Sequence, residues 1–305
     1  MNWTSTFGGE AYSADIDIFN FSAGSYIRAF SVAASVQQTT FDTTLPNLRS
    51  GKGAILVKSA GNNYDSDANF FDSVGGRCGN AIGLGLSCHD ANLDNNHVYP
   101  TVIVVGALAA DGKKSSYSSV GSPLWVSAPG GEYGWHTSYG GSKTGVELEP
   151  AIMTTDLASC SKGYVSASGG AKNNAFNDYD SPHAENSSCN YVNTFNGTSS
   201  AAPNVSGVVA LMLEANPSLT WRDVKHILAT TANQVDSDIS PISVDGIAYH
   251  SWVENDAGYK FHPYYGFGSV DATAAVNASS GYTAGSLGTY QTALVFSNAI
   301  DAAVS

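Results

Sequence analysis

The most informative segment of this 305-residue chain is Asn196-Gly197-Thr198-Ser199-Ser200-Ala201-Ala202-Pro203. Small residues follow the glycine and then apolar residues at helical spacing, so a helix is predicted from about Ser199 to Ala215. A serine in the first turn of a helix lies beside backbone N–H groups that have no intrahelical partner. Those donors and the positive end of the helix dipole suit an oxyanion. In isolation, Gly-Thr-Ser would be interpreted as an ordinary helix cap.

Short apolar runs bounded by Gly, Ser, Asn and Pro predict buried strands. The runs are 17–21, 53–57, 101–105, 124–126 and 151–153. Their continuous apolarity favours a parallel sheet covered on both faces. Asn216-Pro217 ends the first helix, and a second is predicted from Trp221, capped by Ser218 or Thr220. Strands that alternate with helices indicate an α/β domain.

A second polar motif, Lys58-Ser59-Ala60-Gly61-Asn62, follows one of these strands. A rigid strand end can aim the carboxamide of Asn62, although a simple turn asparagine is the plainer interpretation. The two motifs, together with other pieces in the same order, resemble the subtilisin family of serine proteases. The other pieces are 99–107 (YPTVIVVGA), 116–121 (SYSSVG) and 126–130 (VSAPG). An α/β-hydrolase is excluded because Ser199 lacks the G-x-S-x-G elbow.

Further segments are similar to the kexin/proprotein-convertase branch of that family. They are 152–156 (IMTTD), 213–224 (LEANPSLTWRDV), 258–262 (GYKFH) and 265–272 (YGFGSVDA). The resemblance covers about residues 15–160 and 194–275. It implies a three-layer α/β fold with a mostly parallel central sheet, and a cis bond at Tyr99-Pro100.

The resemblance also implies roles for individual residues. Ser199 would be the nucleophile, and its backbone N–H with the Asn62 side chain would form the oxyanion hole. The segment Phe21-Ser22-Ala23-Gly24 would pair with an extended substrate as an added strand. Ala60 and Gly61, with Asn62, would form a wall of the pocket for the residue before the scissile bond.

A serine nucleophile needs a base and an orienting carboxylate, and the family's catalytic Asp and His motifs are not found in this sequence. Four histidines in polar, loop-like surroundings are candidate substitutes: His89, His97, His136 and His183. The plainer interpretation of each is a solvated loop histidine. We therefore expect residues 1–278 to be the C-terminal part of a peptidase domain whose N-terminal portion is missing, with 161–193 as a surface insertion and 279–305 as a tail or linker.

The amino-acid composition limits the classes of partner and the compartment that this chain suits. The chain has 26 acidic and 13 basic residues, a net charge of −13, which disfavours nucleic acid. No apolar run reaches the roughly 18 residues of a membrane span. Four cysteines fit two local disulfides, 78–88 and 160–189, better than a zinc site, although four cysteines allow three pairings. Disulfides indicate an oxidising compartment, so a secreted or periplasmic protein is expected.

The kexin branch cleaves after basic residues by means of acidic pockets, and the net charge agrees with a basic substrate. The carboxylates after Asn62 are Asp65, Asp67, Asp72, Asp90 and Asp94. Asp67 and Asp72 are the predicted pocket residues, and any of the five suits an Arg guanidinium or a structural Ca²⁺. Ser25-Tyr26-Ile27 stands where the branch has an acidic residue, which departs from its calcium and dibasic pattern.

The sequence thus predicts a serine endopeptidase that acts through an acyl-enzyme and prefers basic residues before the scissile bond. Its expected partners are a protein or peptide substrate, the missing catalytic portion and a C-terminal β-domain. The chain alone is expected to be inactive. The alternative is a pseudoprotease or binding module that keeps the fold without catalysis.

Overall fold

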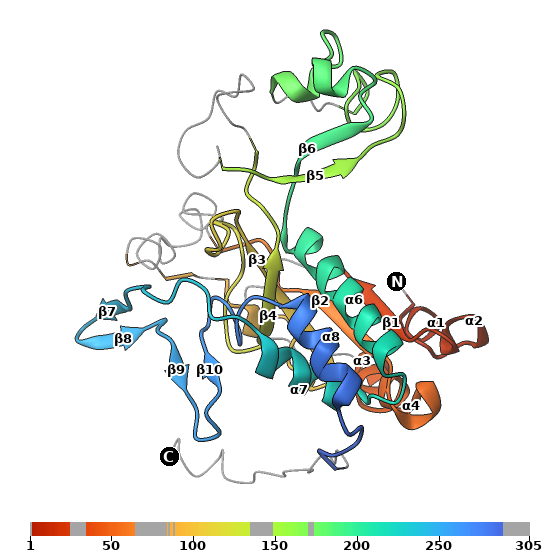
Figure 1. Cartoon of the computed structure of the whole chain (residues 1–305), viewed down its shortest axis with the longest axis vertical. Helices are drawn as coiled ribbons and strands as arrows, with labels where there is room; N and C mark the ends of the chain where they lie inside the picture. Colours follow the sequence, from red (N-terminus) through yellow and green to blue (C-terminus); the bar gives the residue numbers. More distant parts are fainter. Residues whose placement is uncertain are drawn as a thin grey trace.

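A parallel sheet forms the centre of the molecule. The computed structural model describes residues 2–24, 35–64, 84, 86–87, 89–134, 149–169 and 174–288. Within these ranges, four parallel strands lie in the order β1-β2-β3-β4 (Figure 1). The strands are β1 (Ile18–Phe21), β2 (Ile55–Ser59), β3 (Val102–Leu108) and β4 (Leu124–Pro129). The parallel central sheet and the α/β class are confirmed.

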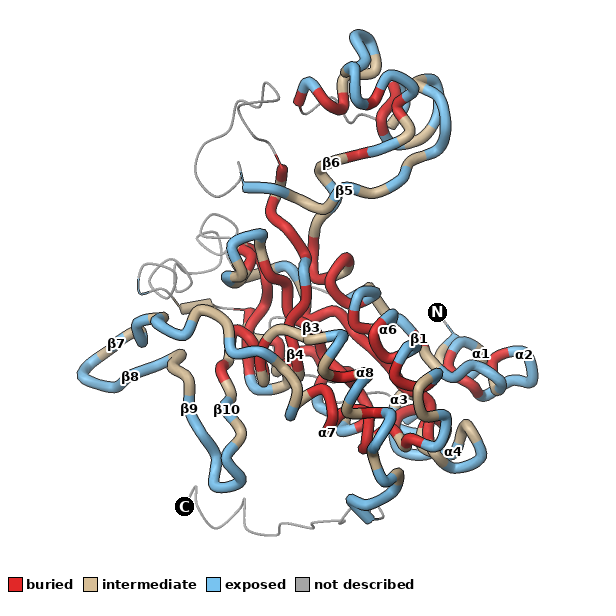
Figure 2. Tube along the Cα trace, viewed as in Figure 1, coloured by how far each residue is buried: buried red, intermediate tan, exposed pale blue. Residues whose placement is uncertain are grey.

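Three helices cover one face of this sheet: α6 (Thr198–Ala215), α7 (Trp221–Thr231) and α8 (Ala272–Gly281). Successive residues of a strand point to opposite faces, so alternate strand residues meet these helices. The strand residues on this side include Ile55, Val57, Ile103 and Val105, and the α6 residues include Val205, Val209 and Met212. Figure 2 shows this buried seam running between the sheet and α6.

The intervening strand residues, among them Leu56, Val102 and Val104, pack into a second core. Phe7 and Phe41 are also buried there. The short helices of this part of the chain are α1 (Trp3–Thr6), α2 (Ala11–Ala14), α3 (Ser35–Thr39) and α4 (Leu45–Asn47). The sheet therefore separates two apolar cores, which explains why its strands are continuously apolar.

The second predicted helix begins as the sequence indicated. The side chain of Thr220 accepts a hydrogen bond from the Asp223 N–H, and Asp223 bonds back to the Thr220 N–H in a capping box. By contrast, the expected cis bond is wrong, since the described chain has no cis peptide and Tyr99-Pro100 is trans.

One predicted strand lies outside the sheet. β5 (Ile152–Thr155) pairs antiparallel with β6 (Tyr191–Phe195) in an arm that extends away from the body (Figure 1). The prediction that residues 151–153 are buried is wrong, because Met153 is 58% exposed. The predicted disulfide between Cys160 and Cys189 is confirmed, and it lies in this arm. Cys78 and Cys88 lie outside the described residues.

Two small hairpins precede α8. They are formed by β7 (Ile242–Val244) with β8 (Ile247–Tyr249), and by β9 (Val253–Glu254) with β10 (Lys260–Phe261). A search of the described residues found no helix with the length and apolarity that a membrane span requires.

Acidification is expected to weaken the fold through His262, which is fully buried. Its Nδ1 accepts from the Tyr264 N–H at 3.0 Å, and its Nε2 lies 2.9 Å from the His250 carbonyl, so the ring is neutral. Burial lowers its pKa from 6.5 to about 4. The unfolded chain therefore binds the extra proton first, and stability present above pH 6.5 is lost as the pH falls towards 4.

Urea unfolding at pH 7 and pH 4.5 measures this loss, which we expect to be about 2 kcal/mol for this one group. The variant His262→Gln keeps an acceptor and a donor but cannot be protonated. Its loss of stability between the two pH values should be smaller than that of the unmodified chain. An equal loss in both proteins would contradict the assignment.

Candidate active site

The candidate site lies at the carboxyl edge of the sheet. β1 and β2 are parallel neighbours, so the segments that follow them, 22–24 and 60–62, leave the sheet at the same edge. The amino end of α6 meets them there, since Ser22 contacts Ser199 and Gly61 contacts Thr198. The topology thus brings together the predicted nucleophile, oxyanion and substrate-pairing segments.

Two hydrogen bonds hold Ser199 against the segment 22–24 that follows β1, which we call the edge segment. The Ser199 Oγ donates to the Ser22 carbonyl at 3.1 Å, and the Ser22 Oγ donates to the Ser199 carbonyl at 3.0 Å. The second bond is available because Pro203, four residues further along α6, has no N–H to offer that carbonyl. The proline inside the helix therefore leaves an acceptor to which the edge segment is anchored.

Asn62 has a defined orientation. Its Oδ1 accepts from both the N–H and the Oγ of Thr198, each at 2.8 Å. With the oxygen engaged in this way, the Nδ2 hydrogens remain for another acceptor. Gly197 lies between the donors: a Cβ built on it would be 3.3 Å from Asn62 Nδ2 and 3.5 Å from the Ser199 nitrogen. Both nitrogens therefore lie close to Gly197 at the amino end of α6, the region where the sequence predicts the oxyanion donors.

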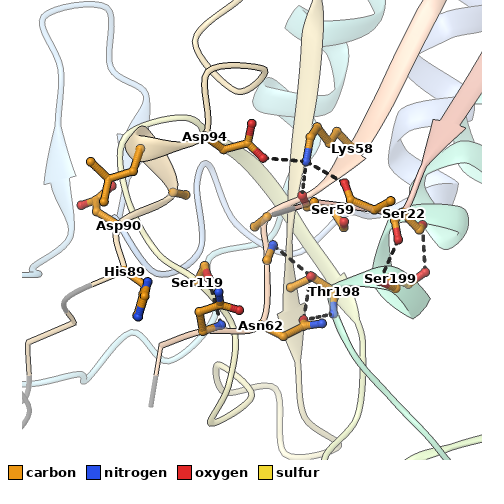
Figure 3. Close-up of a pocket in the computed structure, with 17 residues that line it drawn as sticks. Ser22, Lys58, Ser59, Asn62, His89, Asp90, Asp94, Ser119, Thr198 and Ser199 are labelled. Carbon is orange, nitrogen blue, oxygen red and sulfur yellow. Dashed lines mark hydrogen bonds and ion pairs between the residues drawn. The ribbon is translucent and has the colours of Figure 1, made fainter. Parts of the chain in front are cut away.

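A cavity of about 330 Å³ opens beside these donors (Figure 3). Segments 22–24 and 58–63 form part of its lining, with residues from 89–94 and with Ser119, Thr198 and Ser199. All of Ala60, Gly61 and Asn62 line it, and so do Ser22, Ala23 and Gly24. Phe21 is not in this lining, but its ring lies 5.3 Å from the Lys58 ammonium.

The cavity contains charged groups that the family motifs did not indicate. Lys58 Nζ and Asp94 Oδ2 form an ion pair at 3.0 Å, with side-chain exposures of 1% and 10%. Burial lowers the pKa of Lys58, while Asp94 opposes that change. Burial alone would raise the pKa of Asp94, but His97 and Lys58 lower it overall. The 3.0 Å contact makes Lys58 and Asp94 a buried ion pair in the wall of the cavity.

Asp90 is the second carboxylate of the cavity. Its Oδ1 accepts from the Asn92 N–H at 2.8 Å, and no described cation lies within ion-pair distance of it. Burial raises its pKa, and the bond from Asn92 opposes that rise. The predicted pocket residues Asp67 and Asp72 lie outside the described residues. Asp90 and Asp94, two of the remaining sequence candidates, are the carboxylates seen in the cavity.

None of the described histidines hydrogen-bonds to the Ser199 hydroxyl, whose bond goes to Ser22. His89 is buried and lines the cavity, opposite Ser199 in Figure 3. His97 is buried behind the ion pair, where burial lowers its pKa to about 4. His183 caps a short turn in the arm, and His136 lies outside the described residues. His89 and His97 are thus buried rather than solvated, contrary to the plainer interpretation of loop histidines.

Across the described ranges, no group of three or more His, Cys, Asp or Glu side chains is arranged to hold a metal ion. The expected calcium therefore stays a prediction. Thr198 and Lys58 are the site residues that sequence reasoning missed. The signal for Lys58 was a lysine at the end of an otherwise apolar strand.

The sequence matches a known protein family. Residues 1–268 match the family model Peptidase_S8, the subtilase family. The chain belongs to the subtilase family.

Among individual proteins, it is similar to the Aeromonas extracellular serine protease of Aeromonas sobria, with 34% identity over 92% of this chain and 44% of that protein. The crystal structure of the serine protease of Aeromonas sobria superposes with a TM-score of 0.74 at 31% identity, over 92% of this chain and 46% of that one. Human proprotein convertase subtilisin/kexin type 6 is 44% identical over 88 residues, which are 29% of this chain and 8% of that protein. The chain spans less than half the length of these relatives.

Proposed function

We propose that the chain carries the nucleophile, the oxyanion donors and a substrate pocket of a serine endopeptidase. The observation that carries the proposal is the orientation of Asn62 by Thr198, which leaves the Asn62 Nδ2 hydrogens for another acceptor near Gly197 and the amino end of α6. A carbonyl placed there would meet two N–H donors and the Ser199 hydroxyl at once.

In the proposed reaction, the Ser199 Oγ attacks the scissile carbonyl and releases its bond to the Ser22 carbonyl. That carbonyl then becomes an acceptor for a substrate backbone N–H, as expected of a segment that pairs with an extended peptide. Asn62 and the Ser199 N–H stabilise the tetrahedral oxyanion. The acyl-enzyme forms when the leaving amine takes a proton, and a water later hydrolyses it.

The proton that Ser199 loses when it attacks must be accepted by a base. We place it, with its orienting aspartate, outside the described residues, because no described histidine bonds to Ser199. We further propose a substrate with a basic residue before the scissile bond, as in the kexin branch. The carboxylates of Asp90 and Asp94 in the cavity support this preference. An exported protein is proposed because the Aeromonas sobria relative is extracellular and this chain has a disulfide.

Labelling with a fluorophosphonate tests the proposed function. On the longest natural chain that carries these residues, an adduct is expected on Ser199 and should be lost in Ser199→Ala. Absence of the adduct would instead support the alternative, a binding module that keeps the fold without catalysis.

The 305-residue chain alone is expected to hydrolyse peptides slowly or not at all, since an oxyanion hole without a base leaves only a small part of the rate. Turnover of a fluorogenic peptide by residues 1–305 measures this directly. Robust hydrolysis would contradict the expectation and make His89, the histidine that lines the cavity, the first base to substitute.

A further inference from the structure

A lysine occupies the wall of the substrate cavity. Lys58 is in β2, whose five residues are all buried, and its side chain is turned into the cavity wall (Figure 3). Its ammonium donates to the Ala23 carbonyl at 3.0 Å and to the Ser59 carbonyl at 3.4 Å, and it pairs with Asp94 at 3.0 Å. An ammonium has three hydrogens, so these three acceptors use all of them.

Both carboxylate oxygens of Asp94 also have partners. Its Oδ1 accepts from the Asn96 N–H at 2.9 Å, while its Oδ2 lies against Lys58 and 3.6 Å from His97 Nε2. A substrate cation that approaches Asp94 meets a carboxylate whose charge is already compensated. Asp90 is different, because no described Lys or Arg is within ion-pair distance of it, and its electrostatic neighbour is His250, whose pKa burial lowers. Of the two carboxylates in the cavity, Asp94 is paired with a lysine, and Asp90 is not paired with any described Lys or Arg.

We propose that Lys58 is a specificity-determining residue that limits how strongly this pocket selects a basic side chain. It compensates the charge of Asp94, so that Asp90 alone attracts the arginine or lysine of a substrate. The inference rests on the proposed function only in taking this cavity as the pocket for the residue before the scissile bond.

The position of Lys58 distinguishes this role from simple packing. Lys58 joins two walls of the cavity, since the Ala23 carbonyl belongs to the edge segment and Asp94 ends the 89–94 segment. A purely structural lysine would, when replaced, weaken binding of charged and neutral ligands alike. A lysine that offsets Asp94 must change the discrimination between them, and in the opposite direction from a change at Asp94.

The experiment compares two tripeptides that end in arginine amide or in citrulline amide, which have almost the same shape and differ in charge. Titration calorimetry on the 305-residue chain gives the ratio of the two Kd values without requiring catalysis. An opposite charge a few ångströms away changes an equilibrium by tenfold or more. Lys58→Met should therefore raise the preference for arginine about tenfold, and Asp94→Asn should lower it about tenfold.

The double variant Lys58→Met with Asp94→Asn removes both charges and should return the preference to within about threefold of the unmodified chain. Circular dichroism checks the fold of each variant, and Lys58→Gln replaces Lys58→Met if the latter does not fold. The proposal is overturned if the unmodified chain does not distinguish the two peptides. It is also overturned if both single variants shift the preference in the same direction.

Fluorophosphonate labelling of Ser199 in the longest natural chain reports the proposed function separately. Labelling without the opposite shifts would remove the role of Lys58 and leave the protease intact. The opposite shifts without labelling would leave a charge-selective binding pocket and remove the protease.

Discussion

Asn62→Asp is expected to lower kcat of the active protein by about 10²–10³-fold, with a much smaller change in KM. The aspartate has the shape of asparagine and keeps an acceptor for the N–H and Oγ of Thr198, so the local fold is retained. It lacks the Nδ2 hydrogens and places a negative charge where the oxyanion forms. The loss therefore falls on the transition state rather than on substrate binding.

Steady-state kinetics on the longest natural chain measure this effect, and the urea unfolding midpoint is the control. An unchanged midpoint assigns the loss to the chemistry. A kcat within about threefold of that of the unmodified protein would show that Asn62 is not an oxyanion donor, whatever its orientation.

Gly197→Ala should cost about 1–3 kcal/mol of stability and at least tenfold in kcat/KM. Gly197 has φ 113° and ψ 160°, a region that is essentially restricted to glycine. A Cβ there would also make a tight contact of 3.3 Å with Asn62 Nδ2 and an ordinary contact of 3.5 Å with the Ser199 nitrogen. The Asn62 carboxamide would therefore have to shift by a few tenths of an ångström, in addition to the backbone strain at Gly197.

Gly207→Ala is the matched control. Gly207 lies within α6, is exposed, and has no atom within 4 Å of a built Cβ. Alanine favours helix over glycine, so this variant should gain about 0.5–1 kcal/mol and keep its activity. Chemical unfolding and kinetics on both variants make the comparison. Equal behaviour of the two would exclude a special role for the backbone at Gly197.

Much of the fold could be predicted because local pattern and tertiary environment agree. The apolar runs 53–57 and 101–105 became strands buried on both faces, and the small residues around Ser199 became the start of α6. The prediction failed at residues 151–153, whose apolar run resembles a core strand. That strand lies in the arm, and a short apolar run does not reveal whether another layer covers it.

The site residues that belong to family motifs could be predicted from the sequence. The ion pair between two residues far apart in the sequence could not. Ser199, Asn62 and the segment 22–24 were placed by their motifs, and their roles remain predictions. The contact between Lys58 and Asp94 joins residues 36 positions apart and has no local signal. Because that contact depends on β2 and on the loop before β3, only the folded chain reveals it.

The arm is expected to unfold locally, independently of the central sheet. Its small apolar cluster of Val165, Cys189 and Val192 is separate from the cores on the two faces of the sheet. Amide hydrogens of the arm should therefore exchange with deuterium in a cooperative unit of their own, at a lower free energy than those of β2 and β3. Reduction of Cys160–Cys189 should accelerate exchange in the arm and leave exchange in the central strands unchanged.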